Sequence, residues 1–147
     1  SQKKKYTREK IISLIDLLYI NLTRLYTDNT SNDRIITSSY LHILRQLEHT
    51  IELFYKENKS AAFYANALNI TPKHLNRVTK TSINKTTTQL ITERVLLEAK
   101  RLIVHSNNPL SNISELLGYE DYAYFSKVFK KNTKITPIQF KQKYQQL

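Results

Sequence analysis

This chain of 147 residues contains one glycine, Gly118, and only three prolines. β-Sandwiches, barrels and phosphate-binding loops need glycine and proline at their turns, so a chain this poor in both argues against them. The composition therefore predicts an all-α fold. With 40% hydrophobic residues, the chain is long enough to bury a core without metals or covalent links.

Cysteine is absent, which excludes disulfides, thiolate metal sites and thiol nucleophiles. We therefore expect a reducing, cytoplasmic location. No apolar stretch approaches the roughly 18 residues that a membrane span requires, so no membrane partner is expected. The first residue is Ser1 rather than methionine, which suggests a processed chain or a fragment of a longer protein.

Positive charge is concentrated in the second part of the chain. Residues 1–58 hold 9 basic and 7 acidic residues, net +2, whereas residues 59–147 hold 14 basic and 5 acidic residues, net +9. The pI of the whole chain is about 9.8. A strongly basic segment is the electrostatic pattern expected for binding to a phosphate backbone, and a merely solvated basic surface is the alternative.

Two helices joined by a short loop are predicted within residues 1–58. Apolar residues three and four apart predict a helix over residues 7–26 and a second one ending near Glu57, with a loop at 27–33. We expect the two rows to bury each other in an antiparallel helical hairpin. The rows are Ile11, Ile15, Leu18, Leu22 and Leu25, then Tyr40, Leu44, Leu47, Ile51 and Phe54. The remaining apolar residues Ile12, Leu14 and Ile43 then need either a partner within the chain or a dimer or missing-domain contact.

Residues 59–147 contain a weak internal repeat. Leu68-Asn69-Ile70 aligns with Leu117-Gly118-Tyr119, and Leu75-Asn76-Arg77-Val78 aligns with Phe125-Ser126-Lys127-Val128. Asn and Gly are the residues that best tolerate the left-handed turn after a helix. Thr71-Pro72 and Thr136-Pro137 mark helix starts, and an uninterrupted run predicts a long helix over 87–105. This region is therefore predicted to form two helix-turn-helix subdomains joined by a long helix.

The second helix of each subdomain, over residues 72–81 and 121–131, is polar and basic on its outer side. Such a helix can enter the major groove and read base edges while flanking basic residues meet phosphates. The long helix could hold the two about one duplex turn apart, near 34 Å. We expect Tyr122 to face outward and Tyr124 partly inward. The candidate DNA-binding residues are Lys73, His74, Asn76, Arg77, Lys80 and Lys85, then Tyr122, Ala123, Ser126, Lys127, Lys130 and Lys131.

Residues 60–144 resemble the DNA-binding domain of the AraC/XylS family of bacterial transcription regulators. The most specific match is the run LGYEDYAYFSKVFKK at residues 117–131, followed by Thr136-Pro137 and Phe140. Supporting matches are Leu75-Asn76-Arg77 and, along the long helix, Arg94, Glu98, Ala99 and Leu102. The resemblance implies a sequence-specific DNA-binding regulator with double-stranded DNA as partner, and RNA polymerase as a further one.

The resemblance also implies roles for individual residues. Base-reading positions fall on Lys73, Asn76 and Arg77 and on Tyr122, Ala123, Ser126 and Lys127. Backbone contacts fall near Thr71, Lys80, Asn84, Lys85, Lys130 and Lys131. The sequence departs from the family at Asn84 and Lys134, where glycine is usual, at Ser114, where alanine is usual, and at Thr79, where an aromatic residue is common. Of these, Lys134 is the strained one.

Members of this family usually carry a separate sensing and dimerising domain, which is not in this sequence. We infer either a C-terminal fragment of a longer regulator or a chain that forms a homodimer through residues 7–57. The alternative function is a helical protein–protein interaction module with incidental basic charge. No enzyme, cofactor or metal site is expected, since the basic part has few acids and the four histidines form no ligand set.

Overall fold

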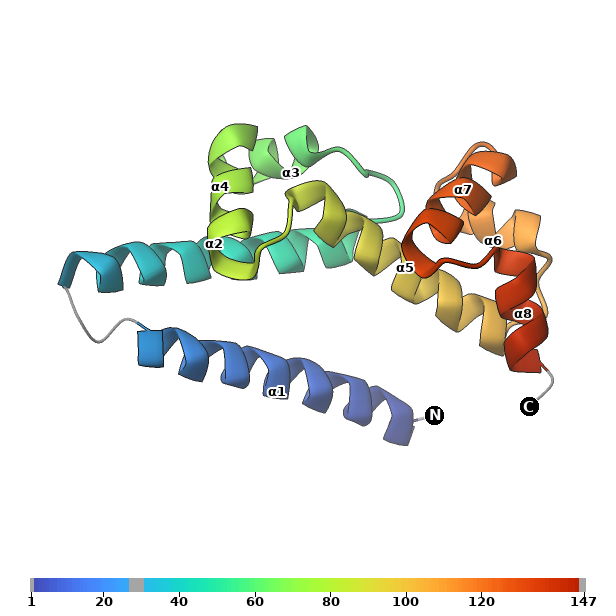
Figure 1. Cartoon of the computed structure of the whole chain (residues 1–147), viewed down its shortest axis with the longest axis horizontal. Coiled ribbons are helices and arrows are strands. Elements are labelled where there is room, and N and C mark those ends of the chain that lie inside the picture. Colours follow the sequence, from blue (N-terminus) through green and yellow to red (C-terminus); the bar gives the residue numbers. More distant parts are fainter. Residues whose placement is uncertain (1, 27–30, 146–147) are drawn as a thin grey trace. The chain divides into compact units, whose positions relative to one another are not determined.

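The computed structural model describes the backbone of residues 2–26 and 31–145, with the side chains of residues 8, 10–22 and 35–145. These residues form eight α-helices and no strand, which confirms the all-α prediction (Figure 1). The helices are α1 Gln2–Tyr26, α2 Ser31–Phe54, α3 Ala61–Ala67, α4 Pro72–Ile83, α5 Thr87–His105, α6 Leu110–Leu116, α7 Tyr122–Thr133 and α8 Pro137–Gln145.

The chain divides into two compact units, Ser1–His42 and Ile43–Leu147. The boundary lies inside α2, whereas the sequence predicted it after residue 58. The reason is that the second half of α2 belongs to the core of the C-terminal unit. Leu47 and Ile51 are only 1% and 6% exposed and pack in one cluster with residues of α5 and α6.

The predicted hairpin of residues 7–57 spans both units, so the pairing of its two apolar rows stays a prediction. In α1 the side chains of Ile11, Ile15, Leu18 and Leu22 are 45–59% exposed. In the second row, Leu47 and Ile51 pack in the core of the C-terminal unit. The side chain of Leu25 and residues 27–30 of the predicted loop lie outside the described residues, and α2 already includes residues 31–33.

Three apolar residues lie outside the two predicted rows: Ile12, Leu14 and Ile43. Ile43 packs against the core of its own chain. Ile12 and Leu14 of α1 remain 39% and 54% exposed. Ile43 therefore has a partner within its own unit, and the choice between an intrachain partner and a dimer or missing-domain contact stays open for Ile12 and Leu14.

The long helix α5 is the centre of the C-terminal unit. It spans residues 87–105 as predicted and begins with a capping box, in which the Thr86 hydroxyl accepts from the Gln89 N–H and the Gln89 side chain accepts from the Thr86 N–H. Val95 and Ala99 in its middle are fully buried. Figure 1 shows α3 and α4 beside one end of α5, and α6, α7 and α8 beside the other.

An ionic network attaches the end of α2 to α5. The Arg94 guanidinium donates two hydrogen bonds to Glu52, at 2.6 and 2.8 Å, and lies 4.2 Å from the centre of the Tyr55 ring. About two turns further along α5, the Arg101 guanidinium donates two hydrogen bonds to the nearly buried Glu98. These bonds lower the pKa of Glu98 below its ordinary value. The network keeps the end of α2 on the surface of α5.

We predict that Leu47→Ala lowers the free energy of unfolding by about 2 to 5 kcal/mol, because it leaves a cavity in the C-terminal core. Leu53→Ala is the matched control on the same helix. The Leu53 side chain is 57% exposed, so the change should stay within about 0.5 kcal/mol. Denaturant unfolding followed by circular dichroism measures both. Equal losses would contradict the placement of α2 in the C-terminal core.

Candidate nucleic-acid interface

Helix α4 is built to expose a basic face. The Thr71 hydroxyl caps it by accepting from the His74 N–H at 3.1 Å, and Pro72 occupies the first helical position, where no N–H is needed. Leu75 and Val78 are fully buried and attach the inner face to the core. The side chains on the outer face are exposed: Lys73, Asn76, Arg77 and Lys80.

Helix α7 repeats this construction. The Asp121 carboxylate caps it by accepting from the Ala123 N–H at 2.9 Å. Phe125 and Phe129 are fully buried on its inner face. The exposed outer face carries Ala123, Lys127, Lys130 and Lys131. Both predicted helices run slightly further than the sequence indicated, α4 to Ile83 and α7 to Thr133.

The turns before α4 and α7 have the same backbone geometry. Asn69 and Gly118 both lie in the left-handed region, with φ of 55° and 83°. In each turn the next residue donates its N–H to a carbonyl five residues back, Ile70 to Ala65 at 3.0 Å and Tyr119 to Ser114 at 3.0 Å. The structure therefore confirms the repeat and the turn residues that the sequence alignment picked out.

The directions expected for two tyrosines are reversed. Tyr122 is half-buried against the core, and its ring lies 6.2 Å from that of Phe125. Burial raises the pKa of Tyr122. Tyr124 is 60% exposed. The sequence carried the correct signal, because residues 122, 125 and 129 are spaced three and four apart and so share one helix face.

Several candidate side chains already have interactions within the chain. The Asn76 side-chain oxygen accepts a hydrogen bond from the Thr87 N–H at 3.3 Å, so this side chain also serves the start of α5. Lys85 forms an ion pair with Glu93 at 2.8 Å, between two partly exposed groups. His74 is half-buried. The structure thus leaves Lys73, Arg77, Lys80, Lys127, Lys130 and Lys131 as the exposed basic residues of α4 and α7.

The departures from the family pattern at Thr79 and Ser114 have a local explanation. Both residues are buried, and each hydroxyl donates to a carbonyl three residues back, Thr79 to Asn76 at 3.1 Å and Ser114 to Ser111 at 2.8 Å. A buried hydroxyl that is hydrogen-bonded in this way carries little penalty. The two substitutions are therefore compatible with the fold.

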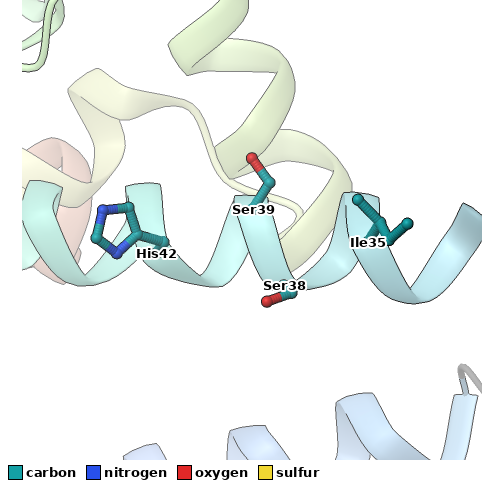
Figure 2. A pocket seen from close by; sticks show the side chains of 4 residues that line it. All are labelled: Ile35, Ser38, Ser39 and His42. Atoms are coloured by element: carbon teal, nitrogen blue, oxygen red, sulfur yellow. The ribbon is translucent and has the colours of Figure 1, made fainter.

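The described part of the chain also bears on other kinds of site. No three His, Cys, Asp or Glu residues lie close enough together there to hold a metal ion. None of the helices in this part has the length and apolar character needed to cross a bilayer. Figure 2 shows a shallow hollow lined by Ile35, Ser38, Ser39 and His42, all from α2, and these side chains form no catalytic arrangement.

Two helix-turn-helix subdomains on one shared helix, each presenting a basic outer face, define a class of DNA-binding protein. The sequence pattern of the helix-turn-helix domain family matches residues 64–143. The chain belongs to this family. Its fold is also that of a solved transcriptional regulator of Chromobacterium violaceum with an AraC-type DNA-binding domain, which superposes with a TM-score of 0.65 at 18% identity and covers 73% of this chain and 96% of that one.

Individual relatives agree with this assignment. The chain is 26% identical over 129 residues to the raffinose operon regulatory protein RafR of Pediococcus pentosaceus, covering 88% of this chain and 46% of that protein. It is 32% identical over 87 residues to the transcriptional regulator YisR of Bacillus subtilis, covering 59% of this chain and 30% of that protein. The solved C-terminal domain of the response regulator AraT of Geobacillus stearothermophilus superposes with a TM-score of 0.63 at 26% identity, covering 69% of this chain and 84% of that one.

The chain spans less than half the length of these two curated relatives. The family pattern covers residues 64–143, which hold the double helix-turn-helix region.

We predict that Lys134→Gly raises the free energy of unfolding by about 1 kcal/mol, because a residue with a side chain in the left-handed region costs about 1 to 3 kcal/mol. Lys134 ends α7 with a φ of 73°. Asn84 ends α4 with a φ of 54° and is the matched control. Since Asn tolerates this region, Asn84→Gly should change stability by less than about 0.5 kcal/mol. Thermal unfolding checks both, and a destabilised Lys134→Gly would show that residue 134 is not strained.

Proposed function

We propose that the chain binds double-stranded DNA by sequence, inserting α4 and α7 into successive major grooves on one face of the duplex, and thereby regulates transcription. The observation that carries this proposal is the equivalence of the two subdomains. Arg77 and Lys127 occupy aligned positions of the repeat, and both are exposed on the outer face of a helix whose inner face is anchored in the core.

The exposed residues divide by the chemistry of their side chains. Arg77 can donate two hydrogen bonds to the O6 and N7 atoms of guanine, and Lys127 can donate to the same acceptors. Lys80 lies in the last turn of α4, and Lys130 and Lys131 lie in the last turn of α7. Basic residues at the flank of a recognition helix contact phosphates, which strengthens binding to every sequence alike.

Asn76 and Tyr122 have a different part in this proposal. Asn76 keeps its amide N–H₂ group for a base acceptor while its side-chain oxygen accepts from the Thr87 N–H. Tyr122 packs its ring toward Phe125 and so helps to hold α7 on the core.

Selection of bound sites from a random duplex library at physiological salt tests the proposal. We expect two short motifs about ten base pairs apart, since the two helices would enter successive grooves. Arg77→Ala should relax base preference at one position of one motif, and Lys127→Ala at one position of the other, each at a cost of about 1 to 3 kcal/mol. Lys131→Ala, the control, should weaken binding to all sequences equally.

Other results would have clear meanings. Binding without enrichment would mean that phosphate contacts alone supply the affinity. Equal loss on every sequence for all three variants would contradict the assignment of base-reading residues. Absence of salt-sensitive binding would favour the alternative function, a helical interaction module with incidental basic charge.

We further propose that the chain forms a homodimer through residues 7–57, and the exposed apolar row of α1 supports this. Large apolar side chains that share one helix face are more stable when a second helix covers them. The row is Ile11, Ile15, Leu18 and Leu22, each at least 45% exposed. RNA polymerase as a partner remains a prediction from the family resemblance.

Sedimentation equilibrium tests the homodimer, and we predict that the parent chain is dimeric and that Leu18→Glu is monomeric, because a charge buried between apolar helices is costly. Leu97→Glu is the control. Leu97 lies on α5 with a similar exposure, 57% against 59% for Leu18, so this variant should stay dimeric. A parent chain that is monomeric at every concentration would contradict the proposal.

A further inference from the structure

Residues 56–59, which connect α2 to α3, are bonded to both helix-turn-helix subdomains. Tyr64 of α3 is fully buried, and its hydroxyl donates a hydrogen bond to the Asn58 carbonyl oxygen at 2.7 Å. The next residue, Lys59, donates from Nζ to the Leu117 carbonyl oxygen at 2.6 Å. Leu117 is the residue that ends α6. Two adjacent residues of one short connection therefore hold the first and the second subdomain.

The Lys59 ammonium group has a defined position. It donates a second hydrogen bond to the Lys56 carbonyl oxygen at 3.0 Å and lies 4.6 Å from the centre of the Tyr119 ring. Burial lowers the pKa of Lys59, because the ammonium has lost part of its water. A cation also interacts favourably with the carbonyl end of a helix and with the face of an aromatic ring.

The backbone at Gly118, in the turn after α6, makes a second contact with residues 56–59. A Cβ atom added to Gly118 would lie 1.8 Å from the Lys56 carbonyl oxygen and 2.8 Å from Lys59 Nζ. Only a residue without a side chain allows the two segments to approach so closely. Residues 56–59 and the turn of the second subdomain are thus in direct contact, with no side chain between them.

The contact continues to α7 through Tyr119. The Tyr119 ring lies 5.2 Å from the ring of Phe125, which is the fully buried inner anchor of α7, and 6.0 Å from the ring of Tyr124. Displacement of Tyr119 would therefore change the packing beneath α7. The Lys59 ammonium is thus connected to α7 through the Tyr119 ring.

Apart from this connection, the two subdomains are joined mainly by α5. Within the described residues, α3 packs mainly on α4, and α4 packs on α5; neither packs extensively on α6 or α7. A helix that joins two bodies leaves them free to change their relative angle when it bends. A second attachment removes that freedom.

We propose that Lys59 is a positioning residue that fixes α7 relative to α4, and so determines the spacing between the two base motifs that the chain accepts. This inference rests on the proposed function. It differs from a general structural role, because Lys59 bonds to the Lys56 and Leu117 carbonyl oxygens and faces the Tyr119 ring, not the base-reading residues or the buried anchors of α4. Base preference within each motif should survive, and the requirement for one spacing should not.

The test measures binding of the 147-residue chain to duplexes that carry the two selected motifs at the selected spacing or with one or two base pairs inserted or removed. Each inserted base pair rotates one motif by about a tenth of a turn relative to the other. For the parent we expect a loss of affinity of about tenfold or more when the spacing changes, comparable to one mismatched contact. For Lys59→Met, which keeps the length of the side chain but not its charge, we expect a loss of about threefold or less.

Two further variants make the result specific. Lys56→Met removes the same charge three residues away, and only the Lys56 carbonyl oxygen, which this change leaves in place, contacts Lys59. It should show the parental dependence on spacing. Lys59→Gln keeps an N–H donor without the charge and should give an intermediate dependence. Duplexes with a single motif are the internal control, on which Lys59→Met and Lys56→Met should bind equally well.

Each outcome decides one question. A folded Lys59→Met that keeps the parental dependence on spacing, while the parent reads both motifs, would overturn the role of Lys59 and leave the proposed function intact. A parent with no preference for any spacing or sequence would overturn the proposed function and this inference with it. If Lys59→Met does not fold, Lys59→Gln decides in the same way: parental spacing dependence overturns the proposal, and a reduced one supports it.

Discussion

Burial of the middle of α5 is the constraint on which the C-terminal unit depends. Val95 and Ala99 have no exposed surface, and helices from both subdomains and from α2 are arranged around this helix. Because α5 is shared, neither subdomain needs a large core of its own, and seven-residue helices such as α3 and α6 are sufficient. Helices this short are unstable alone and depend on such packing.

Polar side chains at the helix starts fix the residue at which each helix begins. The caps at Thr71, Thr86 and Asp121 satisfy N–H groups at the start of α4, α5 and α7, so each helix begins at a defined residue. A recognition helix has to present the same side chains each time it meets its target. Fixed starting residues and buried inner anchors together provide this, and they leave the outer face free to vary in sequence.

Much of this architecture could be predicted from the sequence because its signals are local. Threonine before proline located the start of α4, Asn or Gly after a short helix located both turns, and an uninterrupted helix-forming run located α5. The partner of the apolar face of α1 could not be predicted in this way, since spacing shows that a helix face is apolar but not what covers it. Leu47 and Ile51 fit the hairpin pattern and the C-terminal core equally well.

Tyr122 is a different case, because the 3–4 spacing rule was sufficient to place its side chain on the inner face of α7. Lys59 carries no local signal, since its acceptor, the Leu117 carbonyl oxygen, is distant in sequence.

The single glycine also makes the two copies of the repeat unequal in how they can evolve. In the first turn the left-handed position is held by Asn69, which is exposed, so other residues can be accommodated there at moderate cost. In the second turn Gly118 faces a carbonyl oxygen of another segment, and every other amino acid would collide with it. Among descendants of this sequence, the first turn can therefore accumulate substitutions, while position 118 stays glycine for as long as residues 56–59 remain in place. A second-site change that moves those residues away would be the precondition for any replacement at position 118.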